Sequence, residues 1–132
     1  MNFIVLLSIL LLFLVTDGSI WDFTRFDFIG TLQCRLPGPW CFELTYLELD
    51  NGEKNHEVLA KSRWMCSYVP VQQLKHFGVA HGDELFNEHY ELEALIKHNC
   101  TKDISMTIHH SLGDVRVSET QATLQYALDL TN

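Results

Sequence analysis

The 132-residue sequence has little proline, little glycine and few positive charges. Three prolines and seven glycines are too few for a collagen-like or low-complexity chain, and the 47% of hydrophobic residues can build a packed core. Nine Lys and Arg residues stand against 17 Asp and Glu, which gives a formal net charge of −8. This balance argues against binding to nucleic acid, and against adhesion to anionic membranes through charge alone.

Long apolar runs are missing as well. The longest covers residues 4–15 (IVLLSILLLFLV), whereas a membrane-spanning helix needs about 20 residues. Its length and its place at the start of the chain are typical of a signal peptide, and the small residues Thr16 and Gly18 suit a cleavage site. A buried N-terminal helix is the alternative. We expect a signal peptide over 1–18, one mature domain over 19–132, and secretion to the extracellular space without a transmembrane span.

Past residue 18 the hydrophobic residues recur with the period of β-strands. Apolar and polar residues alternate over 26–34, 90–100, 104–108 and 122–130. The segment from Trp40 to Leu49 alternates too, but its apolar phase shifts near Thr45–Tyr46, which predicts a β-bulge before a turn at 50–52. Several such strands separated by turns predict an all-β, antiparallel β-sandwich of about seven strands.

The intervening segments have weaker patterns. Residues 58–65 suit either a third strand or a short helix, and a helix is the alternative for 84–97. Residues 77–79 predict a short strand. Pro70 favours a loop or an edge strand over 69–71, because proline cannot donate to a strand ladder.

All four cysteines lie after residue 18. An even number of cysteines in a small secreted chain predicts disulfides. Cys34 and Cys100 are each in phase with the inward-facing residues of their strands, so they can meet across the core. Cys41 is out of phase with its apolar neighbours, and Cys66 follows the third strand. We therefore favour the pairs Cys34–Cys100 and Cys41–Cys66, with Cys34–Cys41 around the Pro-Gly-Pro turn as the alternative.

A glycosylation sequon overlaps one of these cysteines. Asn99-Cys100-Thr101 matches the N-x-S/T acceptor of N-linked glycans in secreted proteins. The alternation that turns Cys100 inward turns Asn99 outward, where a glycan can be accommodated. We expect a glycoprotein that is modified at Asn99.

Several segments taken together resemble the nematode transthyretin-like family. Residues 30–34 (GTLQC) resemble its opening strand G-x-L-x-C, and residues 42–50 (FELTYLELD) resemble the next strand. Residues 92–100 (LEALIKHNC) resemble its signature, with His98 and Cys100 in the matching places. Further similar segments are 58–62, 76–82 and 125–130. The resemblance implies a secreted, disulfide-stabilised, transthyretin-like (Ig-like) β-sandwich without known enzymatic activity, which binds small hydrophobic molecules, lipids or cell-surface partners.

No motif in the sequence predicts catalysis or metal binding. G-x-S-x-G, C-x-x-C and H-E-x-x-H are all absent, and no nucleophile–base pair can be identified. The closest clusters are His98 with Cys100 and the adjacent pair His109 and His110, whose side chains would point to opposite faces of a strand. We expect a protein that is not an enzyme, with no catalytic residues, no cofactor and no metal site. A small secreted hydrolase on a transthyretin-like fold is the alternative.

Aromatic residues are the candidates for recognition, although most aromatic side chains belong in a core. The candidates for a ligand or partner patch are Trp21, Phe23, Trp40, Trp64 and His98. Trp21 and Phe23 precede the first strand, where they could form an arm or a lid. His98 lies on the inward face, so its structural role would be that of a hydrogen-bonded core residue beside Cys100. We expect a module that binds an extracellular protein, a lipid or a small hydrophobic ligand, with self-association into a homo-oligomer left open.

Overall fold

The computed structural model describes residues 23–49, 56–82, 88–102 and 104–131. These ranges form eight strands and no helix, one strand more than expected. The strands are β1 (Phe23–Gln33), β2 (Trp40–Leu49), β3 (Glu57–Lys61), β4 (Met65–Ser67), β5 (Val71–His81), β6 (His89–His98), β7 (Met106–Arg116) and β8 (Gln121–Asp129). No helix in this part of the chain is long and apolar enough to cross a membrane. The expected signal peptide and the turn at 50–52 lie outside the described residues.

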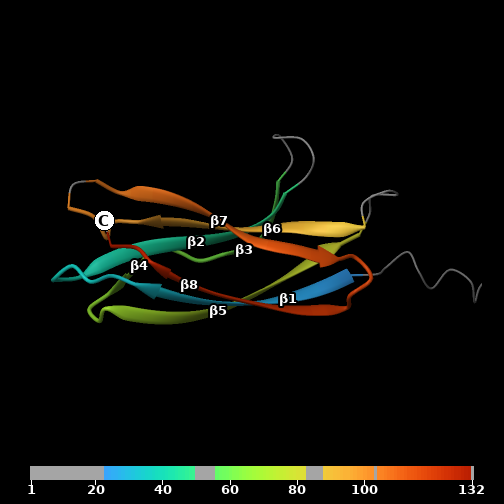
Figure 1. The fold of residues 1–132 in the computed structure, drawn as a ribbon, viewed down its shortest axis with the longest axis horizontal. Helices are drawn as coiled ribbons and strands as arrows, with labels where there is room; N and C mark the ends of the chain where they lie inside the picture. Colours follow the sequence, from blue (N-terminus) through green and yellow to red (C-terminus); the bar gives the residue numbers. More distant parts are fainter. Residues whose placement is uncertain (1–22, 50–55, 83–87, 103, 132) are drawn as a thin grey trace, which may run out of the picture.

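The strands form two sheets that stack face to face (Figure 1). One sheet has three strands in the order β5-β1-β8, and the other has β3-β2-β6-β7 with β4 also paired to β2. β1 and β8 are parallel, whereas the other paired strands are antiparallel, so the antiparallel expectation is wrong for this one pair. The physical reason is that β7 and β8 lie in different sheets. Because β8 is not a hairpin partner of β7, it can enter beside β1 in the same direction.

The weakly patterned segments are strands rather than helices. Residues 58–65 divide between β3 and β4, and Ser62 between them accepts a hydrogen bond from the Leu44 N–H on its side-chain oxygen (2.9 Å). The described part of 84–97 contributes to β6, so both helical alternatives are wrong. β5 extends far beyond the short strand expected at 77–79. The positions of β5 that face the other sheet include Gln72, His76 and Gly78. Because these residues are polar or small, the apolar alternation of β5 is weak in the sequence.

The bulge expected in β2 is wrong, because the extra residue lies in its neighbour β3. Tyr46 pairs with Ala60 and Leu47 with Val58, which leaves Leu59 of β3 unpaired, whereas β2 keeps a continuous register with β6. A second shift, between Leu92 and Glu93, interrupts the pairing of β6 with β7. Such irregularities increase the local twist of the strand and turn successive side chains to a new face.

The core lies between the two sheets. Phe26, Phe28 and Leu32 of β1 are almost completely buried, and the Phe28 ring stacks on Tyr46 of β2 with centroids 4.1 Å apart. Inward residues of β2 and β6 complete this layer. Burial of a large apolar side chain stabilises the folded state by about 1.5–3 kcal/mol, so these contacts supply the main driving force for stacking the sheets.

Both favoured disulfides are confirmed. Cys34 and Cys100 are joined, with both residues 1% exposed, and they link the end of β1 to the residue two positions past β6. This bond crosses from one sheet to the other, and its sequence separation of 66 residues corresponds to about 4 kcal/mol of stabilisation in the chain-entropy model. Cys41 and Cys66 are joined between the paired strands β2 and β4. The alternative Cys34–Cys41 pair is therefore wrong.

Gly30 is required by a close approach in the core. A Cβ at this position would lie 2.5 Å from the hydroxyl oxygen of Tyr126, well inside van der Waals contact. Tyr126 comes from β8, the parallel neighbour of β1, and Gly30 is its register partner. The glycine of the GTLQC segment thus makes room for a buried tyrosine.

Candidate functional site

The structure does not bring together the four patch candidates that it describes, Phe23, Trp40, Trp64 and His98. Trp21 lies outside the described residues. Phe23 is the first residue of β1 and is 54% exposed, whereas Trp64 is 41% exposed and lies beside the five-stranded sheet, where the Lys97 ammonium is 6.0 Å from its ring centroid. Phe23 therefore lies in the three-stranded sheet, whereas Trp64 lies in the link between β3 and β4 of the other sheet, so the two do not share one sheet face.

Trp40 and His98 are core residues, so neither belongs to an exposed patch, although Trp40 also borders a groove of about 280 Å³ beside the Pro-Gly-Pro turn. Trp40 is 2% exposed and its indole Nε1 donates to the Val69 carbonyl oxygen at 2.9 Å. His98 is 1% exposed, and its Nδ1 accepts a hydrogen bond from the Cys100 N–H at 3.1 Å. Burial lowers the pKa of His98 below its usual value, because the interior disfavours the charged imidazolium. The role expected for His98 beside Cys100 is confirmed.

Exposed apolar side chains gather instead on the outward face of the β5-β1-β8 sheet, here called the outer face. Four large hydrophobic residues on it are at least 40% exposed: Phe23, Val71, Phe77 and Val79. Phe77 is the register partner of Asp27, and Val79 is the partner of Arg25. Partners in a ladder point to the same side of a sheet, so these side chains share one surface.

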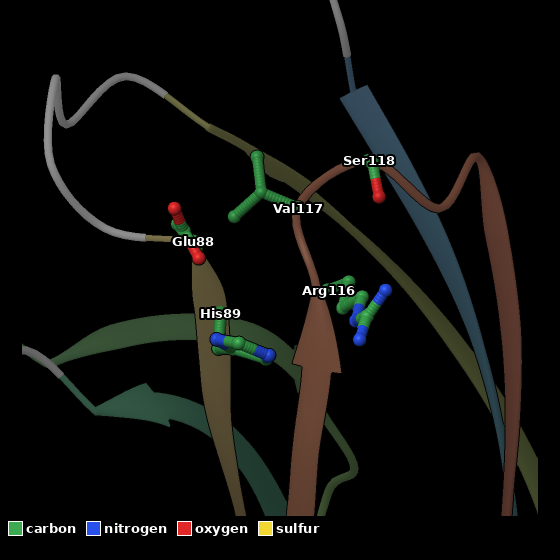
Figure 2. A pocket seen from close by; sticks show the side chains of 5 residues that line it. All are labelled: Glu88, His89, Arg116, Val117 and Ser118. Carbon is green, nitrogen blue, oxygen red and sulfur yellow. The ribbon is translucent and has the colours of Figure 1, made fainter.

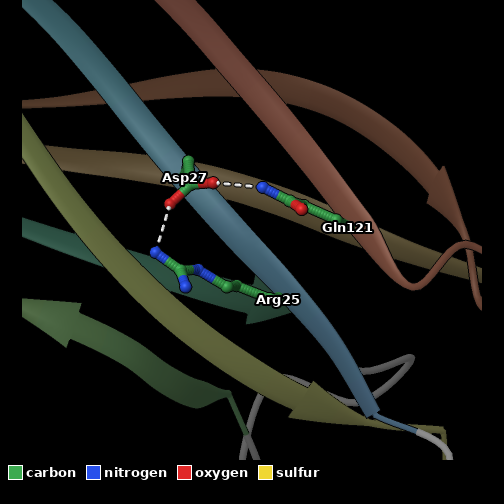
Figure 3. A network of polar contacts seen from close by, with 3 residues as sticks. All are labelled: Arg25, Asp27 and Gln121. Carbon is green, nitrogen blue, oxygen red and sulfur yellow. Dashed lines mark hydrogen bonds and ion pairs between the residues drawn. The ribbon is translucent and has the colours of Figure 1, made fainter.

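A polar network runs across the same face. The Arg25 guanidinium contacts the Asp27 carboxylate at 3.2 Å, and the Gln121 amide donates to the other oxygen of Asp27 at 2.8 Å. Figure 3 shows Asp27 on β1 held from both sides by these two side chains. The Arg25 guanidinium also lies 5.4 Å from the centroid of the Phe77 ring. Each contact is worth at most about 1 kcal/mol at the surface, but together they order the side chains around Phe77.

These residues border a groove on the outer face. Its volume is about 410 Å³, and it is lined by Arg25, Asp27, Phe28, Ile29, Lys75, His76, Phe77 and Thr123. The lining combines two phenylalanines and an isoleucine with two cations, Arg25 and Lys75. Asp27 is the one acidic group in this lining, and its charge is already compensated by Arg25. The groove thus offers an apolar surface with a net positive rim on a chain whose overall charge is negative.

A second groove of about 490 Å³ lies where β6 begins and β7 ends. It is lined by Glu88, His89, Arg116, Val117 and Ser118. Serine, histidine and glutamate are the residue types of a hydrolase, but Figure 2 shows the Ser118 hydroxyl above Arg116 and the His89 ring to its left on the neighbouring strand, so the two groups do not point toward each other. A nucleophile must be within hydrogen-bonding reach of its base, so this arrangement does not form a nucleophile–base pair.

The remaining histidines are dispersed over the sheets. His109 and His110 point to opposite faces of β7, as expected: His109 contacts the Glu93 carboxylate at 2.7 Å, whereas His110 lies against the buried Tyr126 ring at 5.5 Å between centroids. Across 23–49, 56–82, 88–102 and 104–131, no three His, Cys, Asp or Glu residues are grouped so that they could hold a metal ion.

The sequence interpretation missed the outer face as a surface. Alternation over 26–34 did indicate that Asp27 and Ile29 point away from Phe26 and Phe28. The signal for Phe77 and Val79 was weaker, because they alternate with the small residue Gly78 rather than with large apolar ones. That β5 lies next to β1 is a property of the tertiary structure, and only this pairing places Phe77 beside Asp27.

Fold and sequence comparisons place the chain in a class and in a family. The described residues define a disulfide-bonded, all-β protein of two stacked sheets. Residues 30–132 match a family described as Caenorhabditis elegans protein of unknown function (DUF870), and the chain belongs to that family. The uncharacterized protein B0416.7 of Caenorhabditis elegans is 28% identical over 79 residues, which covers 60% of this chain and 58% of that relative. The chain thus matches less than two thirds of the relative's length. No solved structure matches significantly.

Proposed function

We propose that this chain is a secreted, extracellular binding module whose sandwich is of the transthyretin-like type, and that it acts by recognition rather than by catalysis. Two disulfides support an oxidising compartment, because such bonds persist mainly in exported proteins. Cys34 and Cys100, the two cysteines that carry the resemblance to the transthyretin-like family, are bonded to each other between the sheets.

The outer face is the observation that carries the binding function. Phe77 is 68% exposed and Val79, on the same face of β5, is 40% exposed, although large apolar side chains that share a face normally avoid water. Aromatic residues and arginine are also the residue types enriched where proteins bind each other. Arg25 and Lys75 add positive charge next to this apolar surface.

The partner that fits this face is an extracellular protein that presents an apolar side chain flanked by carboxylates. The apolar group would pack on Phe77 and Val79, while the carboxylates would pair with Arg25 and Lys75. The groove is open along the sheet, so a small ligand alone would keep much of its surface in water. A protein surface closes such a groove from above, which favours a protein over a lipid or a small apolar molecule.

The test uses the variant Phe77→Ser/Val79→Ser against the matched control Ile104→Ser. Ile104 is 75% exposed and lies outside the three-stranded sheet, so its substitution removes a similar apolar group from another place. Immobilised wild-type protein and both variants are exposed to extracellular fluid from the source tissue. We expect the wild type and the control to retain the same acidic protein and the double variant to lose it.

Native mass spectrometry of the wild type distinguishes the other occupants. A retained small molecule would indicate a carrier of apolar ligands, and a dimer lost in the double variant would indicate self-association through this face. Either result, or equal retention of the same protein by all three chains, would overturn the proposed partner.

A further inference from the structure

The sequon Asn99-Cys100-Thr101 is held in place by both disulfides. Asn99 lies just after β6 and is exposed. Its N–H donates to the Cys41 carbonyl oxygen at 3.1 Å, and its Oδ1 accepts from the Cys41 N–H at 2.7 Å. Cys41 is itself bonded to Cys66, and the next residue of the sequon, Cys100, is bonded to Cys34.

A glycan on Asn99 is compatible with this geometry. The sugar is attached to Nδ2 of the amide, whereas the bond from Cys41 uses Oδ1. Attachment therefore leaves the hydrogen bond between Asn99 and Cys41 intact. Since β6 lies in the five-stranded sheet, the glycan would cover that sheet and leave the outer face of β5-β1-β8 free.

The folded sequon is, however, a poor acceptor. The enzyme that recognises the sequon must reach all three residues, and the Ser or Thr hydroxyl is an obligatory part of the motif. In the structure the Thr101 hydroxyl donates to the Ile104 carbonyl oxygen, and Cys100 is 1% exposed. The Cys100 N–H is also engaged, since it donates to His98 Nδ1. The sequon must therefore separate from its neighbours before it can enter an active site.

We propose that Asn99 is glycosylated before the Cys34–Cys100 disulfide closes, so that glycan transfer and oxidation of Cys100 compete for the same segment. In the transfer, Asn99 Nδ2 forms a bond to the anomeric carbon of an oligosaccharide on a polyprenyl diphosphate donor. The bond from that carbon to the diphosphate oxygen breaks, the lipid diphosphate leaves, and the nitrogen loses one proton to solvent. In the competing reaction, the Cys34 and Cys100 thiols lose two protons and two electrons to a protein disulfide, which becomes a dithiol.

This inference rests on the proposed secretion of the chain, but its test does not depend on the partner. Unglycosylated mature protein is prepared in two forms, oxidised and folded, or reduced and kept under reductant. Each form is incubated with a microsomal oligosaccharyltransferase and its lipid-linked donor. Modification is read as a glycosidase-sensitive gel shift, with the site located by peptide mass spectrometry.

The reduced chain is expected to be modified at Asn99 at least about tenfold faster than the oxidised chain, because the folded chain offers the sequon only in its locally opened fraction. Cys66→Ser, which keeps Cys34–Cys100, should stay resistant when folded, whereas Cys34→Ser should become an acceptor without reductant. Asn99→Gln should not be modified in any form. Equal rates for the oxidised and reduced chains, or no transfer to Asn99 in either, would overturn the proposal. Loss of the expected partner in the binding test would leave these outcomes unaffected.

Discussion

The hydroxyl groups of Tyr46 and Tyr126 lie 2.8 Å apart and hydrogen-bond to each other between the two sheets. Tyr46 belongs to β2 and Tyr126 to β8, so this bond links strands of opposite sheets. Tyr46 is completely buried and Tyr126 is 8% exposed. The two side chains therefore satisfy each other's polar groups inside a largely apolar core, and neither can lose its partner without cost.

The losses of stability caused by removing each hydroxyl alone should add up to more than the loss caused by removing both. Tyr126→Phe leaves the buried Tyr46 hydroxyl without its partner, which should lower the free energy of unfolding by about 1–3 kcal/mol. In Tyr46→Phe/Tyr126→Phe no hydroxyl is left unpaired, so the loss should be smaller than the sum of the two single losses. Urea unfolding of the wild type, the two single variants and the double variant measures these losses. Tyr68→Phe is the control, because Tyr68 is 86% exposed. Strict additivity would contradict the prediction.

The same pair should make the fold sensitive to alkali. Burial raises the pKa of both Tyr46 and Tyr126 above the usual value of 10.0, because ionised phenolates are poorly solvated in the core. Above about pH 10 the unfolded chain therefore releases protons that the folded chain retains, and the free energy of unfolding falls as the pH rises. Unfolding curves between pH 8 and pH 11 measure this loss. It should be smaller in Tyr46→Phe/Tyr126→Phe, and an unchanged loss in that variant would refute the assignment.

His98 should make the fold sensitive to acid. Burial lowers the pKa of His98, and of His76, below the usual value of 6.5. Below about pH 6.5 the unfolded chain binds protons that the folded chain excludes, so stability present at neutral pH is lost as the pH falls. Protonation of His98 Nδ1 would also remove the acceptor of the Cys100 N–H.

The variant for this effect is His98→Asn, which does not titrate but retains an acceptor oxygen. We expect the stability difference between pH 7.5 and pH 5 to be smaller in His98→Asn than in the wild type. Identical acid dependence in His98→Asn and the wild type would count against this role of His98.

The two disulfides should differ in their reactivity toward thiols. Cys66 is exposed, whereas Cys34 and Cys100 are both 1% exposed. Thiol–disulfide exchange needs a thiolate to reach a sulfur atom, so access decides which bond reacts first. Under graded reduction of the folded protein, we expect Cys41 and Cys66 to be alkylated before Cys34 and Cys100. Peptide mass mapping after short reaction times measures the order, and simultaneous labelling of all four cysteines would be the contrary result.

Much of the fold could be predicted because strand alternation is a local property. The alternation of Phe26 and Phe28 with polar residues predicted the buried face of β1. Cys34 and Cys100 are in phase with the inward-facing residues of their strands, which predicted their disulfide. The failures occur where residues facing the other sheet are small or polar. His76 and Gly78 interrupt the apolar alternation of β5, so its length was not predicted. Trp40 is a different case, because its alternation with Phe42 already indicated the core.

The candidate site was less predictable than the fold. Of the four proposed patch residues that the structure describes, only Phe23 lies on the outer face. Phe77 is the most exposed aromatic residue of this face. The sequence predicted only a short strand around it and did not indicate which strand lies next to it. Exposure of an apolar side chain depends on what covers it, and covering groups come from distant parts of the chain.

The sequence by itself determined which side of β1, β6 and β8 is buried, and it turned Cys34 and Cys100 to the same interior, because side chains alternate with a period of two along any extended backbone. Only the tertiary structure decided that β1 lies between β5 and β8, and that β8 runs parallel to it. The backbone groups of all strands offer the same hydrogen bonds, so local sequence does not choose a neighbour. That choice follows from packing between distant residues, such as Gly30 against Tyr126, and it is this choice that places Phe77 beside Arg25 and Asp27.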